Sequence, residues 1–210
     1  MGAVFMEAGA AIKAKEVLGQ TLRDDGFFDG DRSFGHEFAE GVMFAAMDSF
    51  EERKIPYLGN LLANVAFAPS IDAATANFAL RTAEGLSWLE LCLLALIDRS
   101  DEFPMPNEEP RRSKSWDAHT VKGQLQRMAD MGGGGLLAYR ETLTEDFGLP
   151  TFDTTWSGIQ FTSNGRLVKD LMELGSIPAT DLRPIYNLLL AGDPAEPGTK
   201  GPQQVQGTAK

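Results

Sequence analysis

The sequence predicts a mainly α protein, a helical bundle whose C-terminal half contains a small β-hairpin. Through most of the first 100 residues, apolar side chains recur at spacings of three and four, the period of a helix with one buried face. The run from Trp88 to Ile97 is apolar on nearly every side, which is typical of a helix in the centre of a core. Two short strand-like segments, 136–143 and 157–162, follow later in the chain.

Composition limits the functional classes that the chain can belong to. Its 210 residues are enough for one ordinary domain or two small ones. The formal net charge of −11 argues against a surface built wholly for nucleic acid or anionic lipid, although a local basic patch stays compatible with it. His36 and His119 are the only histidines, so no histidine-rich metal site can form. We expect no cofactor.

The apolar segments predict a protein without a membrane span. The N-terminal segment carries four charged residues within a helical pattern, unlike a signal peptide. The run from Trp88 to Ile97 covers about half of the roughly 20 residues that cross a bilayer. The single cysteine, Cys92, lies in this run and cannot form an internal disulfide, which suits a reducing compartment. We therefore expect a cytoplasmic location.

The first half is predicted to be helical throughout. Helices are expected over 4–22, 34–54 and 55–67, followed by an apolar segment at 73–97 that includes the core helix at 87–97. In the first helix, an apolar stripe is expected to face a partner: Val4, Ala8, Ala11, Ile12, Val17 and Leu18. The second has a wide apolar band, and this width implies burial between two neighbours. Its face consists of Phe38, Val42, Ala45, Ala46 and Ser49, with Met43, Met47 and Phe50 beside it. Ser87 and Glu90 predict a capping box at the start of the core helix.

An acidic, glycine-rich loop at 23–35 joins the first two predicted helices. Four oxygen-bearing side chains fall at the first, third, fifth and twelfth positions of a twelve-residue ring: Asp29, Asp31, Ser33 and Glu40. This spacing partly resembles a calcium-binding EF-hand loop. However, Phe34 stands where such a loop needs its turn glycine, and a bulky residue there would be strained. The alternative is that Asp31 or Ser33 caps the next helix.

The second half is expected to begin after a linker rich in proline and charge. The predicted elements are helix 116–131, strand 136–143, a bend at 150–156, strand 157–162, helix 164–174 capped by Thr162 or Ser163, helix 180–190 and a disordered tail. Gly132 to Gly135 lack a following Gly-Lys-Ser/Thr, which favours a flexible joint over a phosphate cradle. The domain organisation is then a helical half at 1–100, a linker at 101–115, a second half at 116–191 and the tail at 192–210.

The order of elements between about 86 and 175 carries a resemblance to a known fold. A core helix, a second helix, two strands and a helix opened by Thr162-Ser163-Asn164-Gly165 look like a winged-helix domain. Together with the segment Tyr57 to Asn64 in a helical N-terminal half, this arrangement also resembles bacterial domain families of unknown function. The winged-helix resemblance implies that helix 116–131 occupies the position that enters the DNA major groove.

Basic residues gather in and before this helix, although the rest of the chain is strongly acidic. The segment from Pro110 to Ala129 contains five basic residues and only one acidic residue, Asp117. The basic residues are Arg111, Arg112, Lys114, Lys122 and Arg127. These cations would contact phosphates, and Gln124 or Gln126 would read bases. The alternative is that the cations dock against the chain's own acidic N-terminal half.

The sequence thus predicts a non-enzymatic, bacterial-type interaction or regulatory protein that associates with itself or with a protein partner. One alternative is a winged-helix DNA-binding regulator that uses the basic segment 111–127. Another is metal-dependent or acid–base chemistry at the aspartates of the acidic loop: Asp24, Asp25, Asp29 and Asp31. We expect neither a catalytic residue nor a bound metal.

Overall fold

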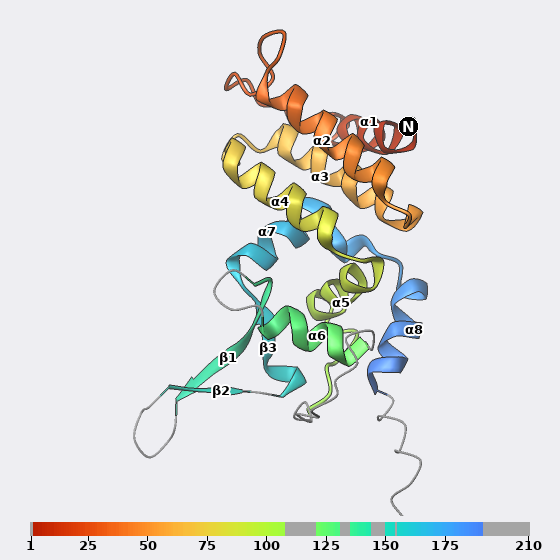
Figure 1. Ribbon diagram of the computed structural model, residues 1–210, viewed down its shortest axis with the longest axis vertical. Helices are drawn as coiled ribbons and strands as arrows, with labels where there is room; N and C mark the ends of the chain where they lie inside the picture. Colours follow the sequence, from red (N-terminus) through yellow and green to blue (C-terminus); the bar gives the residue numbers. More distant parts are fainter. Residues whose placement is uncertain (1, 108–120, 131–134, 144–149, 154, 191–210) are drawn as a thin grey trace, which may run out of the picture.

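The computed structural model describes residues 2–107, 121–130, 135–143, 150–153 and 155–190. These residues form a mainly helical molecule with a small antiparallel sheet. Figure 1 shows the N-terminal helices as one layer at the top, with the core helix, the sheet and the C-terminal helix below it. The prediction of a mainly α protein is therefore confirmed.

The N-terminal layer is built around α3. Its four helices are α1 (Gly2–Val17), α2 (Phe34–Asp48), α3 (Ile55–Phe67) and α4 (Ala73–Gly85). α1 and α2 both pack against α3, and α2 also packs against α4. Ser33 and Asp72 begin α2 and α4 by accepting hydrogen bonds from backbone amides of the first turn.

Two of these helices end earlier than the sequence predicts. α1 stops at Val17, and Gly19 follows with φ 82°, a left-handed conformation that ends a helix. α2 stops at Asp48 because Ser49 is extended, and a short 3₁₀ turn, η1 (Glu52–Lys54), leads into α3. The predicted helix 34–54 is thus interrupted by a bend.

The core helix α5 (Trp88–Asp98) is enclosed by its own chain. Every residue from Glu90 to Ile97 is buried, and α5 contacts α6 (Val121–Asp130), α8 (Ala179–Leu190) and the turn η4 (Leu174–Ser176). The predicted capping box is present, because Ser87 and Glu90 each bond to the other's backbone amide. One apolar cluster contains buried residues from both halves of the chain.

The sheet has three strands, in the order β2-β1-β3. They are β1 (Leu137–Leu143), β2 (Pro150–Asp153) and β3 (Ile159–Phe161), with a 3₁₀ turn, η3 (Trp156–Gly158), before β3. β1 lies in the centre, with Arg140 opposite Asp153 and Leu137 opposite Phe161. The predicted strands at 136–143 and 157–162 correspond to β1 and β3. The prediction of a bend throughout 150–156 was wrong, because residues 150–153 pair with β1.

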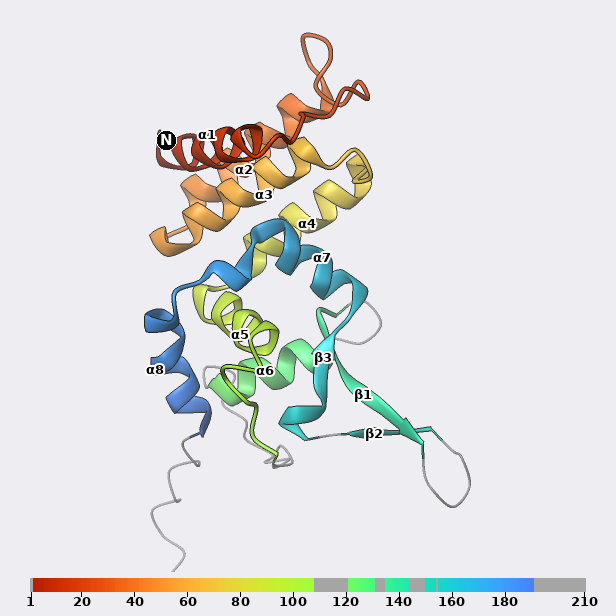
Figure 2. The same ribbon diagram turned by 180° about the vertical axis from the view of Figure 1, so that it is seen from behind.

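α7 (Ser163–Met172) returns from the sheet to the N-terminal layer. Thr162 caps it by accepting a hydrogen bond from the Gly165 amide, as one of the two predicted caps. α7 contacts α3 and α4, and both views place it between these helices and the sheet (Figures 1 and 2). The predicted tail at 192–210, the start of helix 116–131 and most of the linker lie outside the described residues.

A polar cluster joins α7 to the N-terminal layer. Asn60 and Asn64 of α3 donate to the carbonyls of Met172 and Leu171 at 3.3 and 2.9 Å, at the end of α7. Glu173 follows with φ 54° and accepts hydrogen bonds from Asn64 and Lys15, each at 3.0 Å. The two asparagines thus satisfy carbonyls that a helix leaves unpaired at its C-terminal end.

Candidate functional site

The residues predicted to contact DNA are only partly described. Arg111, Arg112 and Lys114 lie outside the described residues, whereas Lys122, Gln124, Gln126 and Arg127 belong to α6. Three of the α6 side chains bond to the chain itself. Ser87 donates to Gln124 at 3.4 Å, Tyr139 donates to Gln126 at 2.9 Å, and Arg127 pairs with the buried carboxylate of Glu90.

This arrangement agrees with the intramolecular alternative for one cation of the basic segment. Arg127 docks on Glu90, which is only 3% exposed, and so neutralises a buried charge. Gln124 and Gln126 hold α6 against the start of α5 and against β1. Lys122 is half-buried.

The acidic loop does not form the twelve-residue ring that its spacing suggested. The positive φ falls at Gly30, whereas Phe34 is already the first residue of α2. Ser33 accepts a hydrogen bond from the His36 amide, as the helix-cap alternative requires. The remaining candidates, Asp29, Asp31 and Glu40, are exposed. Within the described residues, no three His, Cys, Asp or Glu side chains are grouped to hold a metal ion.

Arg23 anchors the start of the acidic loop to α3. Its guanidinium donates to the carbonyls of Val65 and Ile71 at 3.3 and 2.9 Å, and it lies 3.7 Å from the centre of the Phe27 ring. It also binds both carboxylate oxygens of Asp25. These hydrogen bonds lower the pKa of Asp25. The closest carboxylate–cation contact in the loop is therefore used to fix the chain rather than to hold a ligand.

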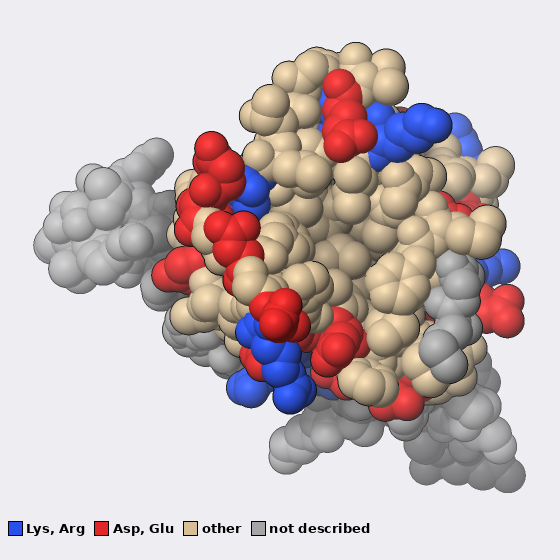
Figure 3. All heavy atoms as spheres, turned by 90° about the horizontal axis from the view of Figure 1, so that it is seen from above, with Lys and Arg blue, Asp and Glu red and all other residues tan. Residues whose placement is uncertain are grey.

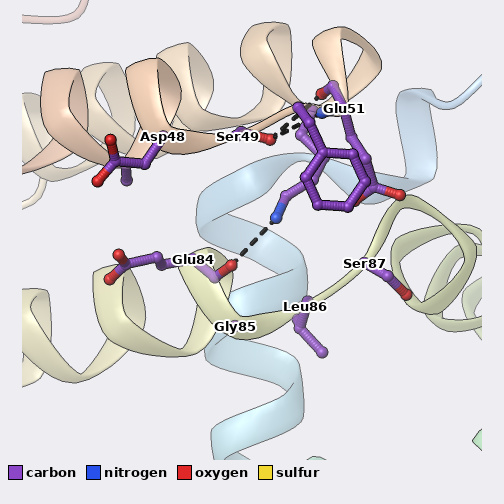
Figure 4. Close-up of a pocket in the computed structure, with 10 residues that line it drawn as sticks. Asp48, Ser49, Glu51, Glu84, Gly85, Leu86 and Ser87 are labelled. Carbon is purple, nitrogen blue, oxygen red and sulfur yellow. Dashed lines mark hydrogen bonds between the residues drawn. The ribbon is translucent and has the colours of Figure 1, made fainter.

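A cavity of about 270 Å³ lies where the end of α2, the end of α4 and the start of α5 meet. Figure 4 shows Asp48, Glu51 and Glu84 around it, together with Ser87. The buried Lys54 donates from Nζ to the carbonyl of Glu84 at 3.1 Å. Burial lowers the pKa of Lys54, although neighbouring carboxylates partly oppose this effect.

The geometry around Lys54 is that of a helix anchor. Its ammonium group binds a carbonyl in the last turn of α4, where a cation is favourable. Glu51 accepts a hydrogen bond from the Trp88 amide at 2.9 Å and so supports the start of α5. Neither residue has a signal in the sequence that marks it as part of a site. Both belong to the charged run Glu51 to Lys54, which looks like an ordinary solvated segment.

Large apolar side chains are exposed along the outer side of α1 and α2. We call this surface the α1–α2 face; it consists of Phe5, Met6, Val17, Phe44, Met47 and Phe50. Met6 is 74% exposed and Phe44 is 58% exposed. α1 begins at the end of the layer where α2 finishes, and the two helices contact each other (Figures 1 and 2). A grouping of apolar side chains on a surface marks an interaction site more often than single ones do.

The α1–α2 face corrects part of the sequence prediction. Val17 and Leu18 were expected to face a partner within the molecule, yet they are 80% and 78% exposed. α2 packs against two neighbours, α3 and α4, as its wide apolar band predicts, and its main apolar face is buried. Met47 and Phe50, beside that face, are exposed. In the described structure α1 packs against α3, and α2 packs against α3 and α4, but these contacts leave the four residues exposed.

Seen from above the N-terminal layer, the centre of the surface is uncharged and hollowed, and both acidic and basic side chains lie around it (Figure 3). An uncharged centre with a charged rim is the usual arrangement of a protein–protein interface. No helix among the described residues is long and apolar enough to cross a membrane. Comparison of the chain with protein-family models, with curated proteins and with solved structures finds no match.

Proposed function

We propose that the chain is a non-enzymatic interaction protein that self-associates through the α1–α2 face. The observation that carries the proposal is the composition of α1. Its apolar residues are not confined to the side that faces α3, because Phe5, Met6 and Val17 are exposed. In the described chain α1 packs mainly against α3, which leaves these apolar side chains uncovered. A second layer against the outer side would complete its burial.

A second copy of the chain suits this surface for two reasons. The outer side of α1 carries Gly9, Ala10 and Ala14, whose small side chains let another helix approach closely. A two-fold contact brings one face against itself, so the face must be self-complementary. The surface seen from above the N-terminal layer has both signs of charge around an uncharged centre, whereas a face of one sign would repel its own copy (Figure 3).

The C-terminal half is proposed to be winged-helix-like. The order α5, α6, β1, β2 supports this reading, because a hairpin follows the second helix as a wing would. β3 departs from a simple hairpin by pairing with the other edge of β1. The DNA-binding alternative then relies on Arg111, Arg112, Lys114 and Lys122 and on the N–H groups of Arg127 that Glu90 does not use, because Gln124 and Gln126 already bond within the chain.

Sedimentation velocity over a range of protein concentrations tests self-association. We expect the wild-type chain to form a dimer and the Met6→Glu/Met47→Glu variant to remain monomeric, because two carboxylates in the contact must be desolvated. Leu188→Glu is the matched control, since Leu188 is 60% exposed on α8, outside the face. It should dimerise like the wild type. A wild-type chain that stays monomeric, or a double variant that still dimerises, contradicts the proposal.

Fluorescence polarisation with duplex DNA at low and moderate salt distinguishes the DNA-binding alternative from an interaction protein that does not bind DNA. Phosphate contacts give an affinity that falls steeply with salt. Self-association without DNA binding supports the interaction protein. Saturable, salt-sensitive binding that is lost in an Arg111→Gln/Arg112→Gln variant supports the winged-helix regulator instead.

A further inference from the structure

A second cavity, of about 350 Å³, lies between the N-terminal layer and the C-terminal half. Its walls come from the end of α4, the first turn of α5, α6 and the residues that begin β1. The apolar part of the lining consists of Phe78, Leu86, Met128 and Leu136. This volume falls in the lower part of the range of about 300–1,000 Å³ that small-molecule sites occupy.

The charged groups of this cavity have both signs, but the positive ones are more accessible to a ligand than the negative one. Glu90 is buried, and its Oε2 accepts hydrogen bonds from the Ser87 amide at 2.8 Å and from the Ser87 hydroxyl at 2.9 Å. Its Oε1 accepts one from Arg127. The Glu90 carboxylate is therefore buried and already paired with a cation, whereas Arg81 and Arg127 are exposed.

Two guanidinium groups remain accessible at the cavity. The Arg127 side chain is 56% exposed, and only one of its nitrogens is used by Glu90. Arg81 is exposed and forms no ion pair with any residue that the structure describes. A guanidinium has five N–H donors in a planar fork that matches a carboxylate. The cavity therefore combines apolar walls with two cations that can bind one anion.

We propose that this cavity binds a small amphipathic carboxylate, with an aromatic or short aliphatic body. The body lies against Phe78, Leu86, Met128 and Leu136, and the carboxylate binds Arg81 and Arg127. Neutralisation of Glu90 accounts for Arg127 but not for Arg81, nor for an apolar space that the described residues leave unfilled. The site lies apart from the α1–α2 face and does not depend on self-association.

The position of the cavity gives the bound molecule a structural effect. α4 belongs to the N-terminal layer, whereas α6 and Leu136 belong to the C-terminal half. A ligand that contacts both halves binds the folded chain and not the unfolded one, so it raises the melting temperature as its concentration rises above Kd.

Thermal shift and isothermal titration with three matched probes test the site. Phenylacetate offers the ring and the carboxylate, phenylacetamide offers the ring without charge, and phenethylamine offers the ring with a positive charge. We expect phenylacetate to raise the melting temperature of the full chain and to bind more tightly than the other two probes. The absence of binding by phenylacetate and by hexanoate, or equal binding of phenylacetate and phenylacetamide, overturns the proposal.

A pair of arginine variants assigns the binding to this cavity. Arg81→Gln is expected to weaken phenylacetate binding by about tenfold, since a hydrogen bond to a charged group is lost. Arg32→Gln is the control, because Arg32 is exposed in the acidic loop and lies outside the cavity. It should bind like the wild type. Equal affinity in Arg81→Gln and the wild type places the probe elsewhere and overturns the proposal.

Discussion

Lys54 shows how a single charged residue can be buried at a junction of helices. Its ammonium group lies among the carboxylates of Glu51, Glu84 and Glu90, which oppose the effect of burial on its pKa. Its bond to the Glu84 carbonyl ties the turn before α3 to the end of α4. Removing a partner from a buried polar group costs more than the net strength of the bond, because the remaining group is left without water.

Lys54→Met tests this anchor. The methionine keeps most of the length of the side chain but cannot donate to the Glu84 carbonyl, and it removes the cation that faces Glu51 and Glu90. We expect the free energy of unfolding to fall by about 1–3 kcal/mol in urea denaturation. Lys13→Met, at an exposed position of α1, should change it far less when both variants are measured in dilute solution. Equal changes in the free energy of unfolding at the two positions would contradict the role of Lys54 as an anchor.

At the scale of elements, the contact between α1 and α3 depends on a glycine. A Cβ atom at Gly59 would lie 2.9 Å from the Cβ of Glu7 and 3.0 Å from the backbone nitrogen of Ala8. Both distances are shorter than side chains normally tolerate. α1 therefore lies close against α3 at a position where α3 has no side chain.

Two glycine-to-alanine substitutions should have opposite effects. Alanine favours a helix over glycine by about 0.5–1 kcal/mol. Gly9 lies in α1 with nothing within 4 Å of an added Cβ, so Gly9→Ala is expected to stabilise the chain. Gly59→Ala is expected to destabilise it and to increase hydrogen exchange in α1, because α1 must move away from α3. Thermal unfolding measures the direction of the stability change in both variants, and hydrogen exchange follows α1. Stabilisation by Gly59→Ala would contradict the expectation, because it would show that α1 accommodates the added Cβ without loss of stability.

The helices could be predicted because their signals are local. The capping box at Ser87 and the cap at Thr162 require only a few neighbouring residues, and the structure contains both. β2 could not be predicted in this way, because its four residues become a strand by pairing with β1. The exposure of Met47 was missed for a similar reason. An apolar band predicts burial but does not reveal whether the covering surface belongs to the same chain.

The candidate sites were harder to predict than the helices. Gln124 and Arg127 were singled out as part of a basic segment, but their bonds to Ser87 and Glu90 join residues 37 positions apart. The cavity beside them is also formed by segments far apart in the sequence, because its walls come from α4, α6 and the residues just before β1. Sequence periodicity predicts which side of each helix is apolar, but it does not predict which helices meet.

At the scale of the whole molecule, the polar cluster at the end of α7 connects the two halves. Asn60 and Asn64 bind the last carbonyls of α7, and Lys15 of α1 reaches Glu173. Glu173 has φ 54°, a left-handed conformation that is unfavourable for a residue with a side chain. The ion pair and hydrogen bonds of its carboxylate offset part of this strain, so the connection should depend on the charge of Glu173.

Acidification is therefore expected to weaken the connection between the halves. Burial alone would raise the pKa of Glu173, but the hydrogen bonds from Asn64 and Lys15 outweigh it, and the pKa lies below the ordinary value of 4.5. In the unfolded chain the carboxyl group has that ordinary value. Its contribution to stability is thus fully present above pH 4.5 and is lost as the pH falls through the lower, folded pKa.

Urea denaturation of the wild type and Glu173→Gln between neutral pH and about pH 3 measures this contribution. The glutamine keeps an acceptor for Asn64 but loses the charge that pairs with Lys15. We expect the variant to be less stable at neutral pH and the difference to shrink as the wild-type carboxyl group takes up its proton. Glu40→Gln, at an exposed carboxylate of α2 without an ion pair in the described chain, should show no such convergence. A difference for Glu173→Gln that stays constant with pH would mean that the carboxylate charge does not hold the halves together.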